Sequence, residues 1–280
     1  MTWYKIILEQ KQPIHIGYKR YGVLAETRIF IPGQTMWGAL TKAYNLMKGN
    51  SLNTNQELFE QITCFYPSFD KENILKPNFK NGEFHLGYLS EKEFRLLFVD
   101  SFTSTAILPE TRTAKDESLH EIEFVLPKPK KSLKNTKLWE KITKLGYNNE
   151  NLKWIGLINI DEKLKDELKN LKIFIGGDSR YGFGLMEIYI KEIKKKEKEL
   201  EKWNLNSDRT LNLKEKTLLN SLEFDNNIKF EGKFEILPTF NFVNMKIENA
   251  KYVIGVGGKI IKGIDGDKYR LIKGVFYIKG

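Results

Sequence analysis

A glycine-rich segment at residues 176–184 constrains the fold of this chain more than any other feature of its sequence. Four glycines, at positions 176, 177, 182 and 184, bracket the residues from Asp178 to Tyr181. They allow the backbone to turn sharply and to approach a neighbouring group where a side chain would clash. Backbone N–H groups in such a loop can hold a phosphate, and the guanidinium of Arg180 can add charged hydrogen bonds. The segment is a candidate anion-binding loop, with a ligand-free bend or bulge as the alternative.

Two familiar nucleotide-binding loops do not fit this segment. A P-loop requires Lys followed by Ser or Thr after its second glycine, and Phe183 and Gly184 stand there instead. A dinucleotide-binding fingerprint requires a following helix, whereas residues 185–190 (LMEIYI) have the composition of a strand. A second glycine cluster, at residues 254–263, is interpreted as a bulged hairpin without a ligand. We therefore expect no cofactor.

The residues upstream of the glycine-rich segment predict a strand and a helix. Residues 154–160 (WIGLINI) form a continuous apolar run, and residues 161–171 place Leu164, Leu168 and Leu171 on one helical face. The order of strand, helix, strand, glycine-rich loop and strand favours an α+β fold with a largely antiparallel sheet.

Other parts of the chain predict further strands and one more helix. Residues 3–9 are rich in β-branched and aromatic residues, and from Thr35 to about Gly49 apolar residues recur at helical spacing. Residues 93–103 and 119–126 are predicted to be two strands that flank a polar, basic connection.

Composition narrows the class of partner. The 280 residues, 41% of them hydrophobic, suffice for a full core, and the single cysteine, Cys64, cannot form an internal disulfide. No metal-ligand spacing, long apolar run or signal peptide occurs, so a cytoplasmic protein without a metal or a membrane partner is expected. The net charge of +10 favours a polyanion, because basic side chains on phosphates release counterions. A lysine-rich solvated surface is the alternative.

The region from residue 15 to residue 28 is a second candidate for RNA contact. It combines cations with aromatic rings, namely Lys19, Arg20 and Arg28 with Tyr18 and Tyr21. Single-stranded RNA is bound by such mixtures, because bases stack on rings while cations follow the phosphates. A basic solvated loop is the alternative. His15 is a weak candidate for a general acid or base, with a structural histidine as the alternative.

Three segments, in this order, resemble the RAMP superfamily of CRISPR interference complexes. PIHIG followed by ETRIFIPGQTMWGALTKAY is similar to the family's first glycine loop and its strand-to-helix junction. LPETRTAKDESLHEIEF is similar to the family's central segment, and IFIGGDSRYGFGLMEI to its G-loop. The resemblance covers about 65 residues between positions 13 and 190. It implies a ferredoxin-like, RRM-related core with inserted hairpin and loop regions.

The resemblance also implies which residues touch RNA. In this family the first loop and the G-loop contact guide RNA, and a central hairpin wedges between guide and target nucleotides. The positions that match the first loop and the G-loop are Lys19, Arg20, Arg28, Gly176, Gly177, Ser179, Arg180, Tyr181 and Gly182. Thr111 and Arg112 match the hairpin.

The domain layout follows from the same comparison. Residues 1–190 are predicted to form the RAMP RNA-binding core, with insertions at about 50–92 and 104–153. Residues 191–218, where charges of both signs alternate, are predicted to be a helical connector. Residues 219–280 are predicted to be a β-rich C-terminal extension.

Departures from the family pattern bear on activity. Trp37 stands where relatives carry Lys or Arg, which argues against a phosphate contact there. Relatives that cut target RNA use an Asp in the first loop, where this chain offers only Glu26. Relatives that process guide RNA carry the G-loop near the C-terminus, whereas about 95 residues follow it here.

These departures predict a non-catalytic subunit of a type III-like CRISPR antiviral ribonucleoprotein. Its expected partners are guide RNA (crRNA), target RNA and other effector subunits. The alternatives are an endoribonuclease that uses His15, or Glu26 with a metal ion, and a protein-interaction scaffold whose RNA contact is incidental.

Overall fold

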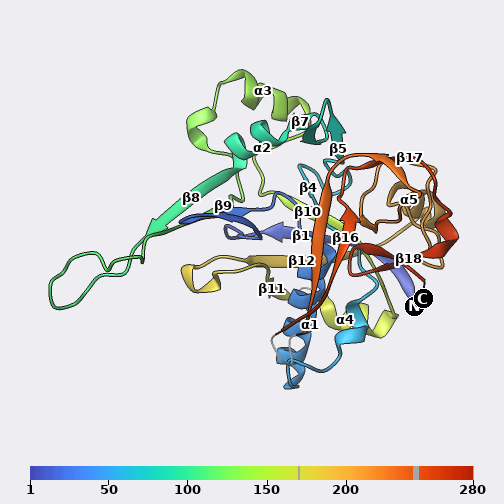
Figure 1. The fold of residues 1–280 in the computed structure, drawn as a ribbon, viewed down its shortest axis with the longest axis horizontal. Helices are drawn as coiled ribbons and strands as arrows, with labels where there is room; N and C mark the ends of the chain where they lie inside the picture. Colours follow the sequence, from blue (N-terminus) through green and yellow to red (C-terminus); the bar gives the residue numbers. More distant parts are fainter. Residues whose placement is uncertain (170, 242–245, 280) are drawn as a thin grey trace.

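A five-stranded antiparallel sheet forms the centre of the protein, whose computed structural model describes residues 1–169, 171–241 and 246–279. The strands lie in the order β11, β12, β1, β10, β4 (Figure 1). The central strand β1 (Thr2–Gln10) pairs with β10 (Lys153–Ile160) on one side and β12 (Leu185–Glu192) on the other. The short strands β11 (Lys172–Phe174) and β4 (Tyr66–Ser68) form the edges.

Two helices lie together on one side of this sheet (Figure 1). The helix α1 (Gly33–Lys48) lies between β1 and β4 in the chain, after two further strands, and α4 (Glu162–Leu168) connects β10 to the β11–β12 pair. They are joined where the Tyr44 hydroxyl donates a hydrogen bond to Glu167 at 2.9 Å. The chain order of strand, helix, strand, strand, helix, strand, with β12, β1, β10 and β4 side by side, is the ferredoxin-like arrangement. The predicted fold class is confirmed.

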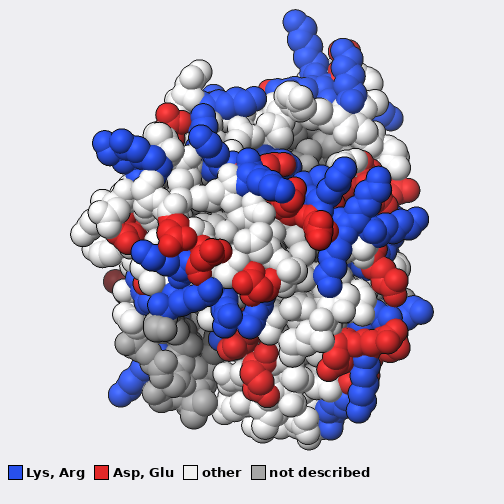
Figure 2. All heavy atoms as spheres, turned by 90° about the vertical axis from the view of Figure 1, so that its right-hand side faces the viewer, with Lys and Arg blue, Asp and Glu red and all other residues white. Residues whose placement is uncertain are grey.

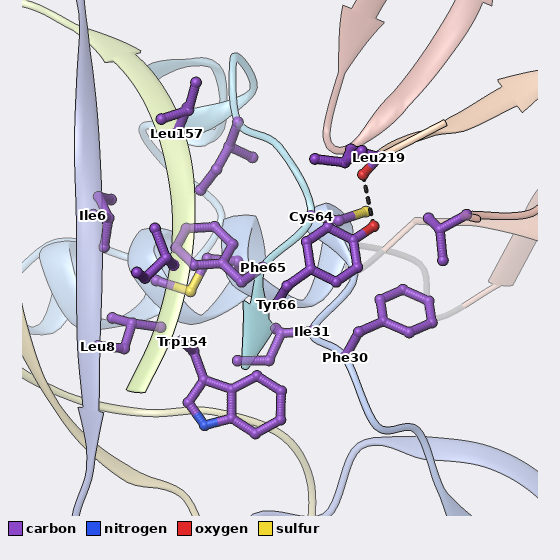
Figure 3. Close-up of a cluster of buried hydrophobic side chains, with 14 of the residues drawn as sticks. Ile6, Leu8, Phe30, Ile31, Cys64, Phe65, Tyr66, Trp154, Leu157 and Leu219 are labelled. Atoms are coloured by element: carbon purple, nitrogen blue, oxygen red, sulfur yellow. Dashed lines mark hydrogen bonds between the residues drawn. The ribbon is translucent and has the colours of Figure 1, made fainter. Parts of the chain in front are cut away.

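Large apolar side chains fill the centre of the molecule (Figure 3). Ile6 and Leu8 of β1 lie in this cluster with Phe65 and Trp154, and all four are buried. Phe65 covers Gly156 so closely that a Cβ atom at this glycine would lie 2.6 Å from the ring. Because Gly156 has no side chain, β10 leaves the space that the Phe65 ring occupies.

Residues 71–152 form an insertion between β4 and β10 that contributes to a second sheet. Its order is β2 (Gly17–Tyr21), β3 (Leu24–Thr27), β9 (His120–Val125) and β8 (Val99–Ser104). The antiparallel hairpin of β8 and β9, residues 99–125 and here named the finger, projects from the body in Figure 1. The other elements before β10 are β5 (Pro77–Lys80), β6 (Glu83–Leu86), β7 (Leu89–Ser90), α2 (Glu91–Phe98), α3 (Lys137–Lys144), and the 3-10 turns η1 (Gln56–Phe59) and η2 (Lys131–Leu133).

The strand predicted over residues 93–103 is wrong in its first half, where the helix α2 is found. Ser90 and Glu93 form a capping box, in which each side chain accepts a hydrogen bond from the other residue's backbone N–H group. Phe94, Leu97 and Phe98 then recur at helical spacing and are buried. The apolar composition favours a strand, but the capping box and the buried face at helical spacing stabilise a helix here.

The C-terminal part forms a second β-rich unit. Its main sheet has the order β15, β16, β13, β19, β18, and β14 pairs separately with β17. The elements are α5 (Lys196–Lys202), β13 (Ser221–Glu223), β14 (Lys229–Glu231), β15 (Phe234–Asn241), β16 (Lys246–Ile254), β17 (Lys259–Lys262), the 3-10 turn η4 (Gly266–Lys268), β18 (Tyr269–Ile272) and β19 (Val275–Ile278).

Two predictions for this part need correction. The connector predicted to be helical over residues 191–218 is helical only in α5, because the Asn-rich segment after it forms turns through side-chain hydrogen bonds such as Asn206 to Thr210. The glycine cluster at residues 254–263 connects β16 to β17, which belong to different sheets, so the predicted bulged hairpin is absent there.

The C-terminal unit packs closely against the core. The Tyr66 hydroxyl donates to the carbonyl oxygen of Leu219 at 2.7 Å (Figure 3), and the Cys64 N–H donates to the side chain of Asn220 at 2.9 Å. The N–H of Gly274 donates to the carbonyl oxygen of Ile62 at 2.7 Å. Burial beneath this unit raises the pKa of the Cys64 thiol to about 12. The thiol is therefore protonated and unreactive at neutral pH.

Gly33→Ala is expected to destabilise the protein because Gly33 meets Gly274 backbone to backbone. A Cβ atom at Gly33 would lie 2.5 Å from the Gly274 Cα. We expect the free energy of unfolding in urea to fall by about 1–3 kcal/mol, as for other overpacked sites.

The matched control is Gly38→Ala in the same helix, where an added Cβ meets nothing within 4 Å. Alanine there should raise the free energy of unfolding by about 0.5–1 kcal/mol through helix propensity. Equal effects of the two substitutions would contradict the close packing of Gly33 on Gly274.

Candidate nucleic-acid interface

The G-loop, residues 176–184, is fastened to the chain segment that leaves β1. The N–H of Gly177 donates to the carbonyl oxygen of His15 at 2.9 Å, and the N–H of Gly184 donates to that of Pro13 at 2.8 Å. These bonds lie near the two ends of the loop. The G-loop therefore lies against residues 13–15, about 160 residues earlier in the sequence. These residues begin the first loop, residues 13–28, which contains the strands β2 and β3.

The middle of the G-loop points outward. Its 3-10 turn η3 (Ser179–Tyr181) is flanked by Asp178 and Gly182, both in the left-handed backbone region. Ser179 and Arg180 are exposed. Among the described residues, Arg180 makes no ion pair, and the backbone N–H groups of 178, 179 and 180 have no acceptor. Free successive N–H groups beside an unpaired guanidinium suit an anion.

Gly176 and Gly182 are required for different reasons. At Gly176, with a φ of 87°, an added Cβ would lie 2.1 Å from the carbonyl oxygen of His15. At Gly182 the φ is 80°, but an added Cβ meets nothing within 4 Å. Packing and backbone conformation both require glycine at 176, whereas backbone conformation alone favours it at 182.

His15 is part of the scaffold beneath the G-loop. Its side chain is buried, and its Nδ1 lies 2.6 Å from the carbonyl oxygen of Glu123 on β9. The imidazole Cδ2 lies 3.5 Å from the position of a Cβ at Gly177. His15, a weak catalytic candidate, thus contacts both the finger and the G-loop from the first loop. These contacts are those of a structural histidine.

Glu26, the other weak catalytic candidate, is held by Arg95. The Arg95 guanidinium pairs with Glu26, Glu91 and Glu123, each at 3.0 Å. It also donates to the carbonyl oxygen of Thr27 at 2.9 Å. These side chains are 18–28% exposed, so the cluster joins α2, β3 and β9 in a partly desolvated setting. In this cluster Glu26 serves as an ion-pair partner of Arg95.

The three basic candidates of the first loop differ in availability. Lys19 and Arg20 are exposed and make no ion pair in the described part of the chain. Arg28 instead pairs with Glu235 at 3.0 Å and stacks 4.4 Å from the Tyr18 ring centroid. Arg28 therefore fastens the first loop to the C-terminal unit, and a phosphate would have to compete with Glu235.

Trp37, which stands where relatives carry Lys or Arg, is used in packing. The indole is buried, and its Nε1 donates to the carbonyl oxygen of Gln56 at 2.7 Å. The ammonium of Lys273 stands 3.6 Å from the indole ring centroid. This cation–π contact helps to hold β18 and β19 against α1.

Thr111 and Arg112 lie in the exposed loop at the tip of the finger (Figure 1). The Thr111 hydroxyl is 2.7 Å from that of Thr113, and the Arg112 N–H donates to the carbonyl oxygen of Leu108 at 2.8 Å. The Arg112 side chain has no ion-pair partner among the described residues. The structure therefore places this pair away from the G-loop residues, at the far end of a projecting hairpin.

Aromatic side chains join the base of the finger to the G-loop. Tyr181 lies 5.6 Å from Phe102 between ring centroids, and its hydroxyl is 3.3 Å from Nε2 of His120. Phe183 lies 5.0 Å from Phe124. The two candidate elements are thus held together by ring contacts.

The sequence alone does not identify Phe102, His120 and Phe124 as neighbours of the G-loop. Residues two apart in a strand share a face, so His120, Ile122 and Phe124 lie on one face of β9. Phe102 is opposite Ile122 and lies on the same face, which is the face that meets the G-loop rings. The alternation in HEIEFV contains this signal. It becomes informative only when the register with β8 is known.

Positive charge is not confined to this region. Figure 2 looks onto the side of the molecule that carries α5 and shows Lys and Arg side chains interspersed with Asp and Glu. Several lysines here have carboxylate partners, such as Lys5 with Glu199 at 2.8 Å and Lys191 with Glu72 at 3.0 Å. Net charge alone therefore does not locate a nucleic-acid site.

The sheet order and the glycine-rich loop before the last core strand define a ferredoxin-like protein with a G-loop. The family model of the RAMP superfamily matches residues 8–187, well over half of the chain. The chain belongs to the RAMP superfamily, which confirms the resemblance of the three segments. No curated protein matches the sequence significantly.

Two solved structures share the fold over most of the chain. In the cryo-EM structure of the Type III-B Cmr-beta bound to cognate target RNA, the matching chain has 11% identity and a TM-score of 0.59. The match covers 91% of this chain and 86% of that one. In the cryo-EM structure of the Type III-B Cmr-beta bound to cognate target RNA and AMPPnP, state 1, the matching chain has 13% identity and a TM-score of 0.61. That match covers 91% of this chain and 85% of the other.

The described residues contain neither a helix that could span a membrane nor a cluster of side chains suited to a metal ion. No helix among them is both long and apolar enough to cross a membrane. In the same residues, no three or more His, Cys, Asp or Glu side chains lie together in a group that could hold a metal ion.

Gly176→Ala is expected to disrupt the scaffold of the G-loop far more than Gly182→Ala. The first adds a backbone clash to an unfavourable conformation and should lower the free energy of unfolding by at least about 3 kcal/mol. The second adds only the left-handed conformational cost, about 1–2 kcal/mol. Urea unfolding followed by circular dichroism measures both. Equal losses would contradict the close approach of Gly176 to His15.

Proposed function

We propose that this protein is a non-catalytic guide-RNA-binding subunit of a type III-like CRISPR ribonucleoprotein complex. The observation that carries the proposal is the G-loop, which is fastened at His15 and Pro13 and presents Arg180, an exposed cation without an ion pair among the described residues. Membership of the RAMP superfamily supports it. So does the fold shared with chains of Cmr-beta complexes that are bound to target RNA.

The G-loop supplies chemistry that suits an RNA backbone. The exposed turn offers N–H groups, the hydroxyl of Ser179 and the guanidinium of Arg180, all of which are donors. Donors held in a fixed arrangement bind a phosphate at little ordering cost. Lys19 and Arg20, on the first loop, add positive charge without carboxylate partners in the described part of the chain. Such contacts position an RNA strand without reading its sequence.

The finger supplies a second kind of contact in this proposal. Its tip residues Thr111 and Arg112 are exposed and stand at the end of a hairpin that projects from the core. A projecting hairpin can reach between the guide strand and a target strand paired with it. Other effector subunits and target RNA are therefore the further proposed partners.

The roles of His15 and Glu26 in packing support the non-catalytic part of the proposal. A general base must reach the proton that it removes, whereas the His15 side chain is only 7% exposed and lies beneath the G-loop. Glu26 is held by Arg95.

Arg180→Ala should weaken binding of guide-like RNA about tenfold or more, because a charged hydrogen bond contributes roughly 1.5–3 kcal/mol. The slope of log affinity against log salt should fall by about one, as expected for one lost phosphate contact. Filter binding over a salt series measures both. The matched control is Arg270→Ala, an exposed arginine on β18 without an ion pair among the described residues.

Equal affinity and an equal salt slope for wild type and Arg180→Ala would contradict the proposed G-loop role. Gly182→Val should also reduce affinity, because a β-branched residue disfavours the left-handed conformation that closes η3.

Purified protein is expected to leave guide-like and target RNA intact, with and without Mg²⁺. Denaturing gel electrophoresis of end-labelled RNA measures this. Cleavage that is abolished by Glu26→Gln or His15→Ala would instead establish the endoribonuclease alternative, provided that both variants retain the wild-type unfolding transition.

A further inference from the structure

Two large aromatic side chains lie side by side on the surface where the finger meets the G-loop. Phe102 of β8 is 40% exposed and Tyr181 of η3 is 42% exposed. Their ring centroids are 5.6 Å apart with an interplanar angle of 48°. Each ring therefore retains surface that the other does not cover.

The buried Phe183 and the half-buried Phe124 support this pair from beneath. Phe183 is 7% exposed, and its ring centroid lies 6.4 Å from that of Tyr181 and 5.0 Å from that of Phe124. Phe183 and Phe124 thus form a second, inner contact between the G-loop and the finger, beneath the contact of Tyr181 with Phe102. The outer rings are thus in a position to contact a ligand.

His120 fixes the orientation of the Tyr181 ring. Its Nε2 lies 3.3 Å from the Tyr181 hydroxyl, and its Nδ1 lies 3.1 Å from the carbonyl oxygen of Ser118. A ring held at its hydroxyl end loses little freedom when a flat ligand stacks on it, which favours binding.

The surroundings indicate the chemistry of that ligand. Arg180, adjacent in sequence to Tyr181, is an exposed cation without an ion pair among the described residues. An exposed aromatic surface next to a free cation matches a nucleotide, whose base has an apolar face and whose phosphate is an anion. A base paired within a helix does not offer its face, so the ligand must be unpaired at this position.

We propose that Phe102 and Tyr181 form a stacking platform for one unpaired nucleobase of the RNA whose backbone is held at Arg180. This inference rests on the proposed function and adds a base-binding subsite to the G-loop. Because Phe102 belongs to the finger and Tyr181 to the G-loop, the platform is complete only while these two elements are in contact.

The experiment compares two single-stranded RNAs of equal length, one intact and one with several consecutive abasic positions. Base stacking on an aromatic side chain contributes about 1–3 kcal/mol per base, which corresponds to roughly 5- to 150-fold in affinity. Wild type should therefore bind the intact RNA at least about fivefold more tightly than the abasic RNA. Fluorescence anisotropy of labelled RNA measures both affinities.

Four variants test the residues. Tyr181→Leu and Phe102→Leu retain apolar bulk but remove the ring, and each should reduce or abolish the preference for intact RNA. Tyr181→Phe retains the ring without the hydroxyl and should keep the preference. Tyr189→Leu is the matched control, because Tyr189 is 39% exposed and lies on β12, outside the platform. It should bind both RNAs as wild type does.

Equal affinity of wild type for intact and abasic RNA would overturn the platform, and so would an unchanged preference in both leucine variants. Arg180→Ala separates this failure from failure of the proposed function, because loss of a phosphate contact weakens binding of both RNAs alike. If Arg180→Ala weakens binding but abasic positions do not, only the platform is wrong. If neither RNA binds wild type, the proposed function is wrong and the platform with it.

Discussion

The pairing of β1 with both of its neighbours is the interaction on which the other features depend. The register places Gln10, the last residue of β1, opposite Met186 near the start of β12. The chain leaving β1 and the chain entering β12 must therefore run next to each other. Residues 13–15 and the G-loop meet for this reason, and their hydrogen bonds through Gly177 and Gly184 continue the pairing beyond the sheet. A change in this register would separate the first loop from the G-loop.

Much of the core and the G-loop could be predicted from sequence because the signals are local. Apolar runs, helical spacing and glycine positions lie within a few residues of the elements that they specify. The helix α2 was missed because its apolar residues also suit a strand, while the capping signal at Ser90 lies just outside the run. The partners of Arg28 and Tyr181 were not predictable because Glu235 and Phe102 are distant in sequence. Such pairs require the register of strands from different parts of the chain.

Arg28 and Arg95 show why residue type alone does not identify a binding cation. Both are arginines close to the first loop, and each is held by carboxylates: Arg28 by Glu235, and Arg95 by Glu26, Glu91 and Glu123. Removing one partner from such a partly desolvated cluster leaves charge uncompensated, so these arginines stabilise the fold. Arg180 has no such partner among the described residues. Whether an arginine here is available to a phosphate therefore depends on the carboxylates around it and not on the residue type.

The dependence of the core on the C-terminal unit has a consequence for synthesis of the chain. The Tyr66 hydroxyl and the Cys64 backbone find their hydrogen-bond partners at Leu219 and Asn220, more than 150 residues later. Domains generally fold as units while the chain emerges from the ribosome. Here the segment around Cys64 cannot be sealed from water until residues 219–274 have left the exit tunnel. The core around Cys64 and Tyr66 therefore stays partly open during translation until these later strands have been made.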